Sequence, residues 1–156
     1  MREPRQSGAA RSCLAAIGSL ILSSCTASPS PNLLLPSPTG VTLQSVDELR
    51  ATHPIPEGQN ILPLKLGQTE SLSYHLIQIR DREAPHIHQS HDLVVTLLHG
   101  QGDLHQAGTA LAMRAGDTAV VPKGVPHYFV NTGDQPAAAF VTFTPPYDGK
   151  DNVPLD

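Results

Sequence analysis

The chain has 156 residues, enough for one domain, and its 39% hydrophobic and 15% charged residues indicate a globular protein of low charge. It carries ten Lys and Arg against fourteen Asp and Glu, with no basic run interleaved with aromatic residues, so nucleic acid is not expected as a partner. Fifteen prolines, twelve glycines and no tryptophan favour many turns and short strands over a helical bundle.

Residues 1–24 have the pattern of a secretory signal peptide. Three arginines precede the apolar run CLAAIGSLIL (13–22). This run is shorter than the helix of about 20 residues that is needed to span a bilayer. The run ends in LSSC (22–25), which resembles a bacterial lipobox, and the resemblance implies that Cys25 is lipidated and becomes the mature N-terminus. An ordinary signal peptide with a chance cysteine is the alternative.

The predicted lipoprotein signal determines the expected location of the protein. The chain would be attached to a membrane only through its lipid anchor, because the mature sequence is acidic and has no preference for anionic lipid. Thr26 is not the acidic retention signal that some bacteria use after the lipidated cysteine. We therefore expect a lipid-anchored protein of the bacterial cell envelope, with the periplasmic side of the outer membrane favoured.

The remaining chain divides by composition. Residues 25–40 comprise the lipidated cysteine and the segment TASPSPNLLLPSPTG, whose serines and prolines predict an extended tether. The folded barrel is expected at 41–148, followed by an irregular surface tail at 149–156. Within the barrel, SVDELRA (45–51) predicts a short helix capped by Ser45, with Glu48 three residues further on.

From Ile61 onward the pattern has a period of two, which is typical of strands. Turn signals recur at roughly ten-residue spacing, as in an all-β sandwich or barrel. One of these signals is the glycine-rich HGQGD (99–103), and further glycines interrupt any long helix. Strands are therefore expected at 71–79, 93–98, 109–113, 118–122, 126–131 and 137–144.

Two motifs carry the candidate chemistry. The stretch GDTAVVPKGVPHYFVN (116–131) contains Gly116, Pro122, Gly124, His127 and Asn131 at fixed spacing. Before it, APHIHQSHD (84–92) contains the His-Ile-His pair at 86–88, with an aspartate four residues after the second histidine and a glycine at position 100. Together, in this order, these motifs resemble the two conserved motifs of the cupin family over roughly residues 60–145.

The residues support a metal site independently of that resemblance. Side chains two apart on a strand point to the same face, so His86 and His88 can aim together into a barrel interior. His127 opens another strand directly after a proline. Three neutral imidazoles from two strands suit one divalent transition metal, which could be Fe, Mn, Ni, Cu or Zn. Open coordination positions would remain for water or substrate.

The sequence departs from the cupin pattern at the acidic ligand. The usual Glu is replaced by Asp92, which shares the even numbering of His86 and His88 but is shorter by one C–C bond. Asp92 is the first candidate for the fourth ligand and for a catalytic base, and the alternative is that it only orients a histidine. His91 is the second candidate ligand, although a surface position or a place beside Asp92 is expected for it. Arg80 also stands where the family has a glycine.

The resemblance implies an all-β, cupin-type double-stranded β-helix (a jelly-roll barrel) with little helix. A homodimer is an expectation from the resemblance alone. It further implies a metal-dependent dioxygenase or an isomerase/lyase acting on a small oxygen-rich substrate. The alternative is a non-catalytic module that binds a small ligand or a metal at the membrane, because the fold alone hosts many functions. A barrel retained only for protein contacts is the third hypothesis.

Overall fold

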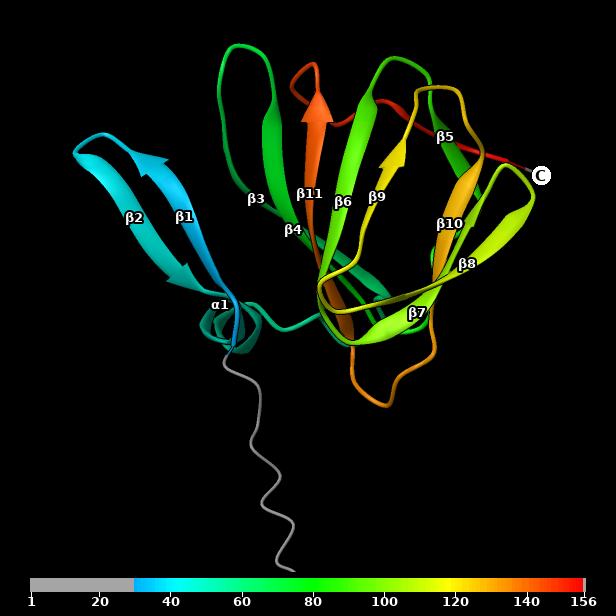
Figure 1. Cartoon of the computed structure of the whole chain (residues 1–156), viewed down its shortest axis with the longest axis horizontal. Helices are drawn as coiled ribbons and strands as arrows, with labels where there is room; N and C mark the ends of the chain where they lie inside the picture. Colours follow the sequence, from blue (N-terminus) through cyan, green and yellow to red (C-terminus); the bar gives the residue numbers. More distant parts are fainter. Residues whose placement is uncertain (1–29, 156) are drawn as a thin grey trace, which may run out of the picture.

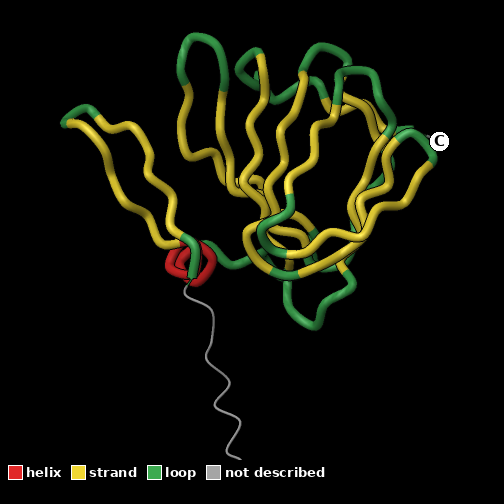
Figure 2. The backbone as a smooth tube through the Cα atoms, in the orientation of Figure 1, coloured by secondary structure: helices red, strands yellow, loops and turns green. Residues whose placement is uncertain are grey.

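The computed structural model describes residues 30–155 as two five-stranded antiparallel sheets that curve around a common interior, with a two-stranded hairpin beside them (Figure 1). In this part of the chain one short helix lies below the hairpin, and all other regular structure is strand (Figure 2). The proposed signal peptide and Cys25 lie outside the described residues. Within them, no helix is both long and apolar enough to cross a membrane.

The first sheet has the order β3-β4-β11-β6-β9. Its strands are β3 (Ile61–Gln68), β4 (Ser73–Ile79), β11 (Ala137–Thr144), β6 (Asp92–His99) and β9 (Thr118–Val121). The second sheet has the order β12-β5-β10-β7-β8. Its strands are β12 (Asn152–Pro154), β5 (His86–His88), β10 (His127–Asn131), β7 (Gln101–Gln106) and β8 (Thr109–Arg114).

The main core lies between these two sheets. Alternate residues of β11 and β6 point inward, so that Val141 and Phe143 pair with Val95 and Leu93 in the antiparallel register and pack with them. The opposite sheet contributes Phe129 and other apolar side chains to the same cluster. The predicted period of two therefore generates a closed apolar interior, as expected for a jelly roll.

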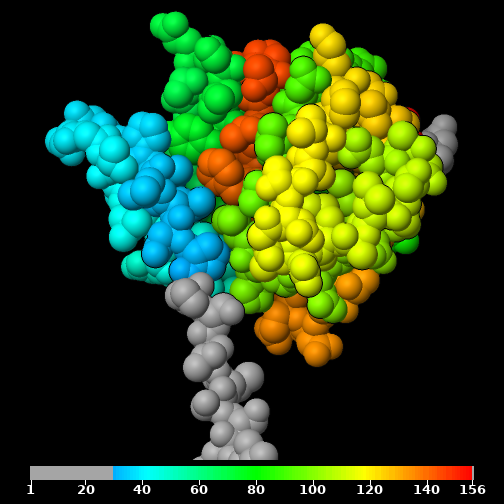
Figure 3. Space-filling view, in the orientation of Figure 1, coloured from blue at the N-terminus to red at the C-terminus, as the bar shows by residue number. Residues whose placement is uncertain are grey.

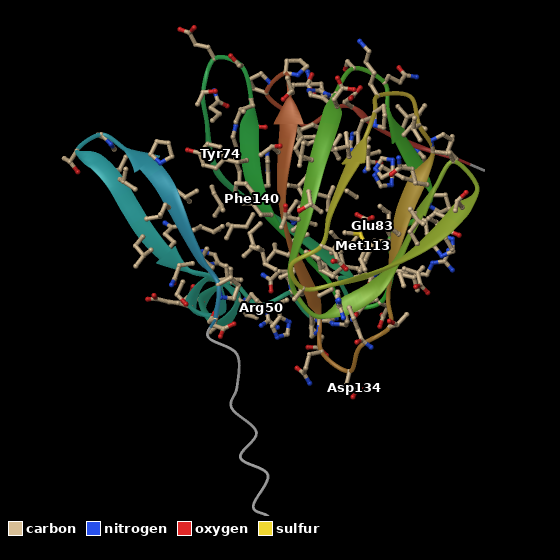
Figure 4. All side chains as sticks on the ribbon, viewed as in Figure 1. Arg50, Tyr74, Glu83, Met113, Asp134 and Phe140 are labelled. Carbon is tan, nitrogen blue, oxygen red and sulfur yellow. The ribbon has the colours of Figure 1, made fainter. Side chains whose placement is uncertain are left out.

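A second core lies outside the barrel. The hairpin β1 (Asn32–Ser37) and β2 (Gly40–Ser45) and the helix α1 (Val46–Thr52) pack on the outer face of the first sheet. Leu35 and Val46 are buried there against Leu76. Figure 4 shows the outward-facing Tyr74 in the gap between hairpin and barrel. The predicted helix is confirmed, and the Ser45 hydroxyl accepts a hydrogen bond from the Glu48 amide.

The tether expected over residues 25–40 is corrected in its second half. Residues 32–37 form β1, and Leu33 and Leu35 are buried, so the fold begins before Val41. The tether was predicted from its serines and prolines, and prolines are rare inside strands. Pro36 nevertheless pairs with Val41 in β1, because a sheet of only two strands tolerates a residue without an amide hydrogen. In Figure 3 the hairpin forms a lobe beside the barrel.

The glycine-rich turn expected at 99–103 is largely strand. The turn is confined to the region of Gly100, whose φ of +85° favours glycine, and β7 begins at the next residue. Gly102 is a strand residue, because a Cβ there would lie 2.3 Å from the Phe129 ring and from the Val130 carbonyl oxygen. Glycine here permits close approach of two strands, which sequence alone does not distinguish from a turn.

The tail expected at 149–156 is also corrected. Residues 152–154 form β12, which pairs with β5, the strand that carries the His-Ile-His pair. The Leu155 amide extends this ladder by donating to the Pro85 carbonyl. The segment after the barrel's last long strand therefore builds the edge of the sheet next to the candidate site.

Candidate metal centre

Three histidines converge at one end of the barrel interior. His86 and His88 lie on β5, and His127 opens β10, where it pairs with His86 in the antiparallel register. All three side chains are buried, and one ring nitrogen from each lies within 4.8 Å of the others. The structure thus brings together the three residues that the two sequence motifs single out.

The hydrogen bonds of the three rings fix which nitrogen faces the centre. Nδ1 of His86 lies 2.9 Å from the Ala84 carbonyl, and Nδ1 of His127 lies 2.9 Å from the Val125 carbonyl. Nδ1 of His88 lies 3.1 Å from the carbonyl oxygen of Asp151. Because a carbonyl only accepts, each Nδ1 must donate its proton, and each Nε2 keeps a free lone pair.

The electrostatic surroundings of His88 and His127 favour the neutral forms of these two rings. Burial, then the neighbouring His86 and His127, lower the pKa of His88 to about 4, against the opposing effect of Asp151. Burial also lowers the pKa of His127, and the Val125 carbonyl only partly offsets this. Neutral imidazoles with a defined tautomer are the form that binds a metal. The donor set therefore fits a divalent transition metal held by three Nε2 atoms.

Asp92 is not brought to this group. Its side chain is exposed, and its carboxylate accepts a hydrogen bond of 2.9 Å from the Lys123 amide. The turn 89–91 between β5 and β6 resets the alternation, so that Leu93, not Asp92, faces the interior. Within residues 30–155, the convergent group consists of the three histidines alone.

The surface position expected for His91 is wrong. The ring is buried, with Nδ1 2.5 Å from a carboxylate oxygen of Asp151 and Nε2 3.3 Å from the Pro146 carbonyl. It packs edge-on against Phe143 and Tyr147. Both ring nitrogens are thus engaged away from the metal centre, and His91 supports the loop instead of offering a fourth ligand.

Asp151 ties the loop after β5 to the end of the chain. Its carboxylate accepts from the amides of Gln89 and Ser90 and from the Ser90 hydroxyl. Burial acts to raise the pKa of Asp151, but the hydrogen bonds from His91 and Ser90 outweigh it and lower the pKa to about 2. The same residue's carbonyl holds His88, so one position stabilises both a ligand and its loop.

Glu83 is a site residue that the sequence reasoning missed. It lies three residues before His86, and its carboxylate accepts a 2.9 Å hydrogen bond from the Phe129 amide. Figure 4 shows it directed into the barrel near Met113, and both residues line the same cavity. Burial raises the pKa of Glu83, while His86 and the Phe129 amide act in the opposite direction. No motif or period marks position 83; its role appears only when this segment lies along β10.

The histidines form one wall of a cavity of about 240 Å³ between the two sheets. Tyr147 and Asn152, from the segment after β11, also contribute to its lining. Tyr147 is stacked on Phe143 at a centroid distance of 4.7 Å, and its amide donates to the Ser73 hydroxyl. The centre therefore faces a partly enclosed space that a small molecule could share with a metal.

Comparisons with known proteins agree with this architecture. Residues 74–143 match the cupin domain family. An uncharacterised protein of Aquifex aeolicus is 38% identical over 98 residues, which are 63% of this chain and 80% of that protein. The structure of KdgF from a Halomonas species has a TM-score of 0.56 at 21% identity, covering 63% of this chain and 91% of KdgF. A cupin-superfamily sugar phosphate isomerase from Silicibacter pomeroyi has a TM-score of 0.50 at 27% identity, covering 55% and 59% of the two chains.

Fold and site together define a jelly-roll barrel with three convergent histidines facing an internal cavity. The chain belongs to the cupin family, through the domain at residues 74–143. The predicted all-β cupin fold with little helix is thereby confirmed.

Proposed function

We propose that this protein binds one divalent transition metal through Nε2 of His86, His88 and His127 and acts on a small molecule in the adjoining cavity. The observation that carries the proposal is the set of three tautomers fixed by backbone carbonyls. They leave a lone pair on Nε2 of each ring, in a group whose ring nitrogens lie within 4.8 Å of one another. A metal bound there supplies a Lewis acid for an oxygen-bearing substrate. The reaction we propose is that of an isomerase/lyase or a dioxygenase.

Glu83 is the proposed proton-transfer group, in place of Asp92. It is the only carboxylate among the described residues that line the cavity, and burial raises its pKa above that of an exposed glutamate. The Phe129 amide holds one of its oxygens in a defined direction. Abstraction of a proton from a carbon of the bound molecule is the step that an isomerase and a lyase share: an isomerase returns the proton to another atom, and a lyase expels a leaving group. A buried carboxylate therefore favours this class over oxygen chemistry. The Silicibacter relative, described as a sugar phosphate isomerase, is compatible with this class.

The first experiment is elemental analysis of the purified protein. We expect one equivalent of Fe, Mn, Ni, Cu or Zn per chain, and its loss in the His86→Ala/His88→Ala double variant. The matched control is His53→Ala/His105→Ala, which also removes two histidines. His53 ends the helix, and His105 stacks on Tyr128 at a centroid distance of 4.3 Å, so neither belongs to the centre. Absence of metal from the protein after reconstitution would contradict the proposal.

The catalytic part of the proposal is tested with Glu83→Gln. This variant keeps the shape and an oxygen acceptor for the Phe129 amide but cannot exchange a proton at neutral pH. We expect it to retain the metal and to lose at least about 100-fold in turnover of any substrate found among enols and keto acids. The same screen should record O₂ uptake. Turnover that is unchanged in Glu83→Gln would exclude this carboxylate from proton transfer.

A non-catalytic binding module is the second candidate function. The observation that favours it is the exposed position of Asp92, which leaves three histidine ligands where the family pattern has a further acidic one. Thermal stabilisation by a ligand without turnover would support this function, since a ligand at 100 times its Kd adds about 2.7 kcal/mol.

We also propose that the protein is lipid-anchored at Cys25 in the bacterial cell envelope, on the periplasmic side of the outer membrane. The support is the LSSC sequence after a short apolar run. Mass spectrometry of the protein from membranes should find an acylated N-terminal Cys25. A Cys25→Ala variant should leave the membrane fraction, whereas its retention there would contradict the lipid anchor.

A further inference from the structure

We infer that the ligand of this cavity is a small and largely apolar molecule with a single oxygen-bearing head group, such as a carbonyl, enol or carboxylate. The inference deepens the proposed function, because the head group is assigned to the metal that the three histidines would hold. It differs from the oxygen-rich substrate expected from the sequence. The difference arises from the walls of the cavity, which the motifs do not describe.

The lining has one polar side and otherwise apolar walls. Of the 23 described residues that line the cavity, 17 have apolar side chains. The polar ones are the three histidines, Glu83, Tyr147 and Asn152. Along β11, the inward-facing Val141 and Ala139 lead away from Phe143, whose ring lies 5.2 Å from that of His88. The polar head group therefore belongs at the histidine end and the apolar body at the Ala139 end.

A polyhydroxylated ligand does not suit these walls. A sugar carries a hydroxyl on most carbons, and each hydroxyl buried without a partner lowers affinity by at least about fivefold. The lining among residues 30–155 includes no Ser, Thr, Gln or Asp. It also includes no Lys or Arg, the side chains that most often pair with a phosphate. The described walls thus favour an apolar body over a sugar or a sugar phosphate.

The volume limits the size of the ligand. A cavity of 150 Å³ in a protein core accommodates benzene, so about 240 Å³ accommodates roughly ten non-hydrogen atoms. The space exists partly because β11 presents small side chains, Ala137 and Ala139, at the end of the cavity away from the histidines. A larger side chain at position 139 would shorten the cavity without touching the metal ligands.

The test is a series of straight-chain 2-oxo acids, from pyruvate to 2-oxodecanoate, titrated calorimetrically into the metal-loaded protein. We expect the affinity to rise about fourfold with each added methylene, up to roughly ten non-hydrogen atoms, and then to fall. Ribose, glucose and glucose 6-phosphate serve as polar probes and should bind more weakly than the best oxo acid. Tighter binding of a sugar or its phosphate, or an affinity independent of chain length, would overturn the inference.

Two variants make the result specific to the cavity. Ala139→Leu should lower the optimum chain length by two or three carbons while leaving metal content unchanged. Thr142→Leu is the matched control, because it introduces the same side chain on the opposite face of β11 and should keep the wild-type optimum. An unchanged optimum in Ala139→Leu would overturn the inference.

The His86→Ala/His88→Ala variant separates this inference from the proposed function. If this variant lacks metal but binds the oxo acids as tightly as the wild type, with the same dependence on chain length, the apolar cavity stands and the assignment of the head group to the metal fails. If metal binds but chain length has no effect, the metal proposal stands and the apolar ligand is excluded.

Discussion

Each of the three convergent histidines is oriented by a backbone carbonyl, but His88 depends on a residue far along the chain. Its carbonyl partner belongs to Asp151, 63 positions away, whose side chain also binds the loop after β5. Hydrogen bonds to metal ligands typically change metal affinity 10–100-fold. Asp151 is therefore a positioning residue, and its carboxylate lies 3.9 Å from Nδ1 of His88, on the side of the ring away from Nε2.

Replacing this side chain tests that role. Asp151→Ala removes the acceptor for Ser90 and for His91, and we expect metal affinity to fall at least about tenfold through disorder of the loop that directly follows His88. Asp151→Asn keeps the shape and one oxygen, so it should lose less. Competition with a chromogenic chelator measures both variants. Equal affinity of Asp151→Ala and the wild type would show that His88 is held without this loop.

At the scale of elements, the hairpin β1–β2 is an addition to the barrel, held by its own core. Leu33 and Leu35 alternate with the exposed Leu34, which is 72% exposed, so only one face of β1 is packed. That face covers the outer side of the sheet whose inner side lines the cavity. Stability and site chemistry should therefore respond independently to changes in the hairpin.

A pair of adjacent substitutions checks this. Leu35→Ala should lower the free energy of unfolding by about 2–3 kcal/mol, because it leaves a void in the second core. Leu34→Ala should change it by less than about 0.5 kcal/mol, since this side chain is exposed. Chemical denaturation measures both, and metal content should stay at the wild-type value. Equal effects would mean that residues 32–37 behave as the tether predicted from composition.

Sequence periodicity identified most strands of the two sheets, because a half-buried strand leaves a period of two in its own residues. Periodicity failed where the pairing of a strand decides which residues it accepts. Pro36 is tolerated in β1 because β1 pairs with a single strand. His86 and His88 were predictable because their spacing places them on one face of a strand, and His127 was predictable from the spacing of the motif at 116–131. The direction of Asp92 was not, since a three-residue turn resets the alternation. Glu83 is positioned by a hydrogen bond from Phe129 on β10, so the residues around position 83 could not predict its role.

For the molecule as a whole, the buried histidines make stability depend on pH. In the metal-free protein, His88 has a pKa of about 4, below the 6.5 of an unfolded histidine. Between these values the unfolded chain binds more protons, so the free energy of unfolding decreases as the pH falls from 6.5 toward 4. The lowered pKa of His127 also makes the free energy of unfolding decrease as the pH falls, whereas the raised pKa of Glu83 opposes this decrease.

Comparison with His88→Gln isolates the contribution of this ring. Between pH 7 and pH 5, the chelator-treated wild type should lose about 2 kcal/mol more stability than the variant. Urea denaturation at both pH values measures the difference. Parallel pH profiles for the two proteins would show that the buried His88 does not resist protonation.

The carbonyl oxygens that orient the three imidazoles have a consequence for how the site tolerates mutation. Ala84 and Val125 contribute main-chain atoms that every amino acid possesses, proline included. Point mutations at these positions exchange side chains and leave the acceptors in place. The tautomers are thus set by the backbone conformation. The side chains next to the three histidines can therefore change widely while the histidines keep their orientation.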